Sequence, residues 1–215
     1  MTTITIIDYG GSNLKSVYKA LESVSNKKIN VKVSSNVKEI ASSDKIVFPG
    51  QGAIGDCMSQ LKKTGLGRKI KTLCQTKPFL GICLGLQSLM RTSEEDNGTD
   101  CLNLIEGEVK RFKKPNNISE NNFDKIPHMG WNNVYWEKMH PLLKGIPSGT
   151  RFYFVHSYFV TPKDPELTVG KTNYLGEFTS SIGSGNIFAT QFHPEKSSAS
   201  GLKLLENFVK WDGAS

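Results

Sequence analysis

The first half of the chain repeats one pattern, in which a short β-rich run leads through a turn into an amphipathic stretch. The pattern predicts strands at Ile4–Asp8, Asn30–Ser34, Lys45–Phe48 and Pro78–Ile82, and helices at Asn13–Val24 and Leu84–Arg91. Strands that alternate with helices form parallel sheets that are covered on both faces. We therefore expect a doubly wound, mostly parallel α/β sheet flanked by helices, with its functional edge at the carboxyl ends of the strands.

The second half of the chain is organised differently. Strand-like runs occur at Glu108–Phe112, Asn133–Trp136, Arg151–Tyr158 and Ile187–Phe192, separated by clusters of Pro, Gly and Asn. They predict an added, largely antiparallel layer, and Leu202–Trp211 predicts a closing amphipathic helix. Because the 215 residues contain no repeat and no clear linker, we expect one domain over residues 1–215.

Composition excludes several classes of protein. The sequence has no long apolar run, which argues against a membrane span, and its first apolar stretch resembles a core strand rather than a signal peptide, so we expect a cytoplasmic protein. The net charge of +7 is spread along the chain without a nucleic-acid motif, so we expect no nucleic-acid partner. No metal site is expected, because the four cysteines lack zinc-ligand spacing (Cys57, Cys74, Cys83 and Cys101).

The sharpest local motif surrounds Cys83. A buried strand ends at this cysteine, and Gly81 and Gly85 lie two residues to either side of it. Small flanking residues permit the sharp strand-to-helix turn of a nucleophile elbow, and a helix N-terminus favours the reactive thiolate. Taken alone, the motif is also compatible with a buried cysteine that packs as a small hydrophobe.

A thiolate nucleophile needs a base and a group that orients the base. His193 follows an apolar strand and has Glu195 two residues on, so that both side chains point the same way in an extended segment. Of the other histidines, His140 has no evident orienting partner, and His128 and His156 sit beside aromatic, strand-like residues. A lone His-x-Glu can also arise by chance on a surface.

The run Pro49-Gly50-Gln51-Gly52 is a candidate oxyanion hole. It ends a core strand in a glycine-rich turn whose amides can point to the same edge as Cys83, where the amide of Leu84 would join them. A glycine-rich turn can instead bind phosphate, but this one matches neither a dinucleotide-binding nor a Walker pattern.

Taken together, GICLGLQ, QFHPEKS and PGQG resemble the class I, triad-type glutamine amidotransferases over essentially the whole chain, and the spacing of Cys83 and His193 is typical of that family. Three further motifs resemble the branch formed by the glutaminase subunits of imidazole glycerol phosphate synthase, which serve histidine biosynthesis. They are DYGGSNL at residues 8–14, PHMGWN at 127–132 and YFVHSY at 153–158.

The resemblance implies a glutaminase that needs no cofactor. Cys83 would be the nucleophile, His193 the general acid and base, and Glu195 its orienter. The oxyanion hole would involve Gln51, Gly52 and Leu84. L-glutamine would be bound with the help of Gly50, Gly52, Gln87, Glu95, Ser157 and Tyr158.

The resemblance also implies a partner, a separate (β/α)8-barrel synthase subunit that consumes the ammonia. Asn13, Trp131, Tyr153 and Lys196 would lie towards it. One departure concerns Gln51, where this branch usually has Val. In the family this peptide is thought to rotate to complete the oxyanion hole, and only its backbone is required.

Three alternatives remain open at this point. The same glutaminase chemistry could supply ammonia to a partner that amidinates sugars for surface polysaccharides. A γ-glutamyl peptidase of related fold would act without a partner. A non-catalytic binding subunit is the third, and the retained Cys83, His193 and Glu195 argue against it.

Overall fold

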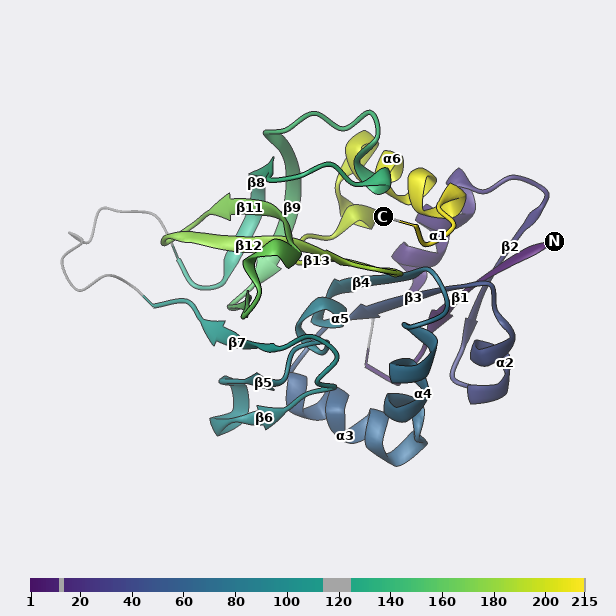
Figure 1. The fold of residues 1–215 in the computed structure, drawn as a ribbon, viewed down its shortest axis with the longest axis horizontal. Coiled ribbons are helices and arrows are strands. Elements are labelled where there is room, and N and C mark those ends of the chain that lie inside the picture. Colours follow the sequence, from purple (N-terminus) through teal and green to yellow (C-terminus); the bar gives the residue numbers. More distant parts are fainter. Residues whose placement is uncertain (12–13, 114–124, 215) are drawn as a thin grey trace.

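A parallel sheet forms the centre of the fold (Figure 1). The computed structural model describes residues 1–11, 14–113 and 125–214, so that Asn13 lies outside the described residues. The strands are β1 (Thr2–Ile7), β2 (Ile29–Ser34), β3 (Lys45–Gly50), β4 (Phe79–Cys83) and β13 (Ile187–Thr190), in the spatial order β2-β1-β3-β4-β13. Each neighbouring pair is parallel, which confirms the predicted sheet.

Helices cover both faces of this sheet (Figure 1). On one face lie α1 (Leu14–Val24) and α6 (Ser198–Lys210), and on the other α2 (Val37–Ser42), α3 (Ile54–Thr64) and α4 (Leu66–Leu73). Side chains alternate between the faces with the two-residue period of a strand. Val47 packs in the core beneath α1 and α6, whereas its neighbours Ile46 and Phe48 pack with α3 and α4. Every helix in the described ranges is too short or too polar to span a membrane.

Residues after β4 add the expected, largely antiparallel strands beside β13, and the exception is a parallel pairing of β5 with β7. The sheet continues from β13 through β12 (Glu177–Ser184), β10 (Tyr158–Pro162), β7 (Gly107–Arg111), β5 (Thr92–Ser93) and β6 (Thr99–Asp100). A branch runs from β12 to β11 (Thr168–Asn173), β8 (His128–Trp136) and β9 (Thr150–His156). Single 3₁₀ turns lie at Glu95–Asn97, Pro141–Leu143, Pro165–Leu167 and Pro194–Lys196.

The predicted strand Arg151–Tyr158 is divided at Ser157. Residues before it belong to β9 and pair with β8, whereas residues after it belong to β10 and pair with β7. The carbonyl of Ser157 accepts a hydrogen bond from the amide of Phe112 at 3.0 Å. The division places Ser157 between the β8–β9 pairing and the β7–β10 pairing. The alternation of apolar residues along the sequence could not predict this change of partner.

The helix after Cys83 is also shorter than predicted. The sequence predicts Leu84–Arg91, but α5 spans Leu84–Gln87. The carbonyls of Ser88, Leu89 and Met90 accept hydrogen bonds from the amides of residues 102–105 instead of continuing the helical ladder. Pairing with a distant segment therefore ends this helix after one turn.

Candidate active site

The chain makes a sharp turn at Cys83, between β4 and α5. Cys83 has φ 55° and ψ −106°, a positive-φ conformation outside the standard regions that is costly for a residue with a side chain. The flanking glycines make room for the turn. A Cβ atom on Gly85 would lie 1.9 Å from the carbonyl oxygen of Phe48, and one on Gly81 would lie 2.9 Å from the Cβ of Ala189. The local sequence thus has the small residues that this elbow requires.

Cys83 differs from the other thiols in its surroundings. All four cysteines are free. Burial raises the pKa of Cys57 and of Cys101 to about 12, and it raises the pKa of Cys74 as well. These three thiols therefore stay protonated and unreactive near neutral pH, whereas Cys83 lines the central pocket.

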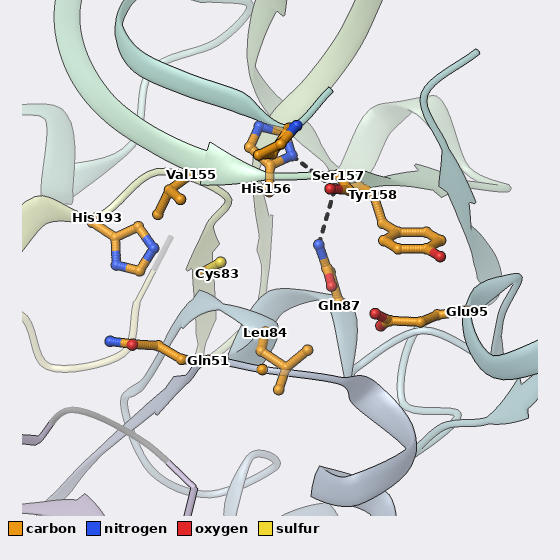
Figure 2. A pocket seen from close by; sticks show the side chains of 12 residues that line it. Gln51, Cys83, Leu84, Gln87, Glu95, Val155, His156, Ser157, Tyr158 and His193 are labelled. Carbon is orange, nitrogen blue, oxygen red and sulfur yellow. Dashed lines mark hydrogen bonds between the residues drawn. The ribbon is translucent and has the colours of Figure 1, made fainter. Parts of the chain in front are cut away.

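His193 and Glu195 form a buried pair beside the pocket. Nδ1 of His193 lies 2.8 Å from Oε1 of Glu195, and both side chains are only 2% exposed. Among the described residues, Nε2 of His193 has no hydrogen-bond partner, and Figure 2 shows the imidazole on the side of the pocket that faces Cys83. Burial lowers the pKa of His193, but Cys83 and the Glu195 carboxylate outweigh burial and raise it to about 10. The arrangement suits a base that exchanges a proton with Cys83.

A cavity of about 330 Å³ opens beside Cys83 and His193 (Figure 2). Most of the residues predicted to bind glutamine or the oxyanion line it, namely Gln51, Gly52, Leu84, Gln87, Glu95, Ser157 and Tyr158, together with Pro127, Val155 and His156. Gly50 is not among the lining residues. It packs behind the turn, where a Cβ atom would lie 2.6 Å from the Cβ of Leu84.

The candidate oxyanion turn is held by Tyr9, the second residue of the DYGGSNL motif and not one of the predicted site residues. The backbone N–H of Gln51 donates to the hydroxyl of Tyr9 at 3.2 Å, and the hydroxyl lies 3.3 Å from the carbonyl oxygen of Gln51. Burial raises the pKa of Tyr9, so its hydroxyl remains neutral. Gly52 follows with φ +85°, a conformation that favours glycine.

A chain of hydrogen-bonded side-chain amides leads from Gln87, which lines the pocket, to Cys83. Nε2 of Gln87 donates to the carbonyl oxygen of Tyr158 at 3.0 Å and to Oε1 of Gln191 at 3.1 Å. Nε2 of Gln191 then donates to Sγ of Cys83 at 3.6 Å. Gln191 was not among the site residues predicted from the sequence, although it lies only two residues before His193. The expected extended segment from His193 to Glu195 was wrong, because Pro194–Lys196 forms a 3₁₀ turn that brings the Glu195 carboxylate back to the imidazole.

Glu95 is fixed at the far end of the pocket, away from His193 (Figure 2). Its Oε2 accepts a hydrogen bond from the amide of Ile54, the first residue of α3, at 3.0 Å. Burial raises the pKa of Glu95, and the bond from the Ile54 amide lowers it in part. The carboxylate is thus held in place at the pocket wall, where it can accept from a cationic group.

The residues predicted to face a partner gather on the outer side of β8 and β9. Trp131 lies opposite Tyr153 in the strand pairing, with the ring centroids 6.3 Å apart, and Nζ of Lys196 lies 5.8 Å from the centroid of Tyr153. Met129 and Tyr135 extend this β8–β9 patch along β8 and are more than half exposed. Exposed apolar side chains in one patch are typical of a protein interface. Asn13 cannot be placed, since it lies outside the described residues.

The described residues contain no group of three or more His, Cys, Asp or Glu side chains that could hold a metal ion.

The matching family model and similar known proteins both relate this chain to glutamine amidotransferases and their relatives. The family model for class I glutamine amidotransferases matches residues 5–211. The chain is 46% identical over 215 residues to "Imidazole glycerol phosphate synthase subunit HisH" of Nitrosococcus oceani, with all of both chains covered. It is 50% identical over 210 residues to the protein of the same name from Thiobacillus denitrificans, covering 97% of this chain and 91% of that protein.

Solved structures share the fold at low sequence identity. A crystal structure of a glutamine amidotransferase superposes with a TM-score of 0.71 at 14% identity, covering 96% of this chain and 97% of that chain. A glutamine amidotransferase from Thermotoga maritima gives a TM-score of 0.64 at 16% identity, covering 93% and 78%. On the family match and on relatives that are this similar over their full length, the chain belongs to the class I glutamine amidotransferases.

Proposed function

We propose that this chain is the glutaminase subunit of an imidazole glycerol phosphate synthase. It would hydrolyse L-glutamine to glutamate and ammonia and pass the ammonia to a synthase subunit in histidine biosynthesis. The observation that carries the proposal is the cysteine, histidine and carboxylate set of Cys83, His193 and Glu195, found in a chain 46% to 50% identical to the named subunits of two bacteria. Residues 1–215 would form one glutaminase domain, and the reaction would take place in the cytoplasm.

The first half-reaction forms a thioester. His193 takes the proton of Cys83, and the thiolate attacks the side-chain carbonyl carbon of glutamine to form a tetrahedral intermediate. When the C–N bond breaks, His193 returns the proton to the departing nitrogen, so that ammonia leaves and the glutamyl group stays on sulfur. Glu195 holds the imidazole through Nδ1 and leaves Nε2 for the reacting atoms.

The second half-reaction releases glutamate. His193 deprotonates a water molecule, which attacks the thioester carbonyl carbon. The C–S bond then breaks, sulfur leaves as the thiolate, and the proton held by His193 returns to it. The oxyanion of both tetrahedral intermediates would be stabilised by the amide of Leu84 and by the turn at Gln51 and Gly52. Glutamate and the free thiol result without any cofactor.

The pocket fits the zwitterionic substrate. Glu95 lies across the cavity from His193, so an amino group bound there would place the far end of glutamine near the sulfur (Figure 2). Gln87 and the backbone at Ser157 and Tyr158 line the space between them. This assignment makes Glu95 the group that recognises the α-ammonium of glutamine.

The partner would be a separate (β/α)8-barrel synthase subunit that binds the β8–β9 patch. The patch is exposed and partly aromatic, and it reaches the pocket, because Val155 lies two residues beyond Tyr153 on the same side of β9 and lines the cavity. Ammonia is largely protonated at neutral pH and is lost once it enters solvent. A partner seated at the mouth of the pocket would receive it directly.

The test measures glutamate release from glutamine by the wild-type chain and by Cys83→Ala. Each is assayed alone and with the barrel subunit and its ribonucleotide substrate, and Cys101→Ala serves as the matched control for loss of a thiol. We expect strong stimulation by the partner in wild type and in Cys101→Ala, and a loss of at least about 10³-fold in Cys83→Ala. Glutaminase activity that ignores this barrel would redirect the search to another ammonia acceptor, and activity in Cys83→Ala would overturn the mechanism.

A further inference from the structure

Gln191 is a fully buried polar residue that the mechanism above does not use. It is 0% exposed and lies just after the end of β13, between Gln87 and Cys83. Its backbone N–H is already bonded to the carbonyl of Ser180 at 2.8 Å. An uncharged amide is costly to bury unless its donors and acceptor have hydrogen-bond partners. The role of Gln191 can therefore be inferred from its two side-chain contacts, with Gln87 and with Cys83.

The contact with Tyr158 fixes which end of the Gln87 side-chain amide is the NH₂ group and which is the oxygen. A backbone carbonyl oxygen can only accept, so the group of Gln87 that faces it must be the NH₂. The same oxygen lies 2.7 Å from Nδ1 of His156, which therefore carries a proton and donates to it. Burial lowers the pKa of His156 to about 3, so the imidazole is neutral. The second N–H of Gln87 is then free to donate to Gln191.

The orientation of Gln191 follows in turn. Because its Oε1 accepts from Gln87, its NH₂ must be the end that meets Sγ of Cys83. A sulfur that receives an N–H is favoured as a thiolate, since a hydrogen bond to the charged form stabilises that form. The opposite orientation would place two NH₂ donors against each other at the Gln87 end and an amide oxygen against the sulfur at the Cys83 end.

We propose that Gln191 is a catalytic residue of the glutaminase reaction, which donates a hydrogen bond to the Cys83 thiolate and is held in that orientation by Gln87 and the Tyr158 carbonyl. The proposal rests on the glutaminase function proposed above. Gln191 is not among the residues that line the substrate cavity, whereas Gln87 is. Gln191 thus acts on the sulfur, and Gln87 links the wall of the substrate pocket to it.

The proposal predicts different effects on kcat and KM for substitutions at Gln191 and at Gln87. Replacing Gln191 by Met keeps the length of the side chain and removes the donor. In the complex with the barrel subunit, Q191M is expected to lower kcat about tenfold with little change in KM for glutamine. Gln87→Met removes a lining residue as well and is expected to change both kcat and KM. Equal effects of the two variants on KM would contradict the separate roles.

The deciding experiment uses alkylation of Cys83 by iodoacetamide in the full chain, without glutamine or partner, followed by mass spectrometry of the modified cysteine. Failure of the glutaminase assay therefore does not affect this test. The rate is measured from pH 5 to 9 for wild type, Q191M and Gln191→Glu. Loss of the donor is expected to move the midpoint of the pH profile upward by about one unit, and a carboxylate beside the sulfur should move it further.

Ser180→Ala is the matched control. Ser180 is also 0% exposed and its backbone carbonyl accepts the hydrogen bond from the Gln191 amide, but its hydroxyl has no hydrogen-bond partner within the described ranges. Its midpoint should equal that of wild type. If Q191M, which preserves packing best, has the wild-type midpoint, Gln191 has only a structural role and the proposal fails. Thermal unfolding of each variant verifies that the folded protein is being titrated, and Q191M decides the outcome if the carboxylate variant does not fold.

Discussion

The hydroxyl of Tyr9 holds the backbone amide of Gln51 at 3.2 Å, 42 residues away in the sequence. The amide of the candidate oxyanion turn is therefore bonded to a side chain outside the cavity lining, while Gln51 and Gly52 themselves line the cavity. For the Gln51 amide to stabilise an oxyanion, this bond has to break.

Tyr9→Phe should therefore raise glutamine hydrolysis by the chain alone. Removing the hydroxyl takes away a hydrogen bond worth about 1 kcal/mol, so an increase of about fivefold in kcat is expected. Glutamate release is measured without partner, and Tyr18→Phe is the control, because its hydroxyl bonds Glu22 on the exposed surface of α1. A partner-free rate that stays at the wild-type level in Tyr9→Phe would show that this bond does not limit activity.

Gln51 and Gly52 should tolerate substitution very differently. Gln51→Val keeps the backbone amide, so partner-stimulated activity should stay within about threefold of wild type. Gly52→Ala places a side chain at φ +85°, although no atom lies within 4 Å of the new Cβ, and the strain of about 1 to 2 kcal/mol should distort the turn. A tenfold or greater loss of kcat is expected for Gly52→Ala. Similar losses in both variants would mean that the Gln51 side chain itself takes part.

Trp131→Ala should weaken binding of the partner. Trp131 is 43% exposed and packs edge-on against Tyr153, so its loss should cost binding energy at the centre of the β8–β9 patch while leaving the fold intact. Affinity for the proposed synthase subunit is measured by calorimetry, and a loss of at least about tenfold is expected. Met139→Ala is the control, since Met139 is 87% exposed but lies beyond the end of β8. Equal losses for the two variants would exclude the patch as the interface.

Acid should destabilise the protein through its buried histidines. Burial lowers the pKa of His128 and His140 to about 4 and that of His156 to about 3. The pKa values of these histidines in the folded state lie below their unfolded value of about 6.5. At any pH between the folded and unfolded pKa values, the unfolded state therefore binds more protons than the folded state. The free energy of unfolding should therefore fall as the pH drops from about 6.5 towards 4.

His140→Asn isolates one of these groups. Nδ1 of His140 accepts from the amide of Leu142, a contact that the asparagine oxygen can replace. Urea unfolding between pH 6.5 and 4.5 should show a pH dependence that is weaker by up to about 1.4 kcal/mol per pH unit than in wild type. Parallel curves for variant and wild type would mean that His140 does not titrate on unfolding.

The sequence by itself determined the features that depend on neighbours along the chain. Alternating strands and helices predicted the parallel sheet, which the structure confirms. Glycines around Cys83 predicted the elbow, because the steric demand of a sharp turn is met within a few residues. The close spacing of His193 and Glu195 predicted their pairing, although the structure forms it across the 3₁₀ turn Pro194–Lys196 and not along the predicted extended segment. Such local constraints are written directly into residue type and spacing.

Only the tertiary structure decided the contacts between distant segments. The amides of residues 102–105 end α5 early, the junction at Ser157 divides one predicted strand into two, and Gln191 reaches a sulfur 108 residues away. The bond from Gln51 to Tyr9 belongs to the same class. Hydrogen-bond partners of this kind depend on which strands pair and in what register, and no local spacing rule encodes that choice. The sequence therefore predicted the candidate reactive groups, and the tertiary structure decided which neighbours hold them.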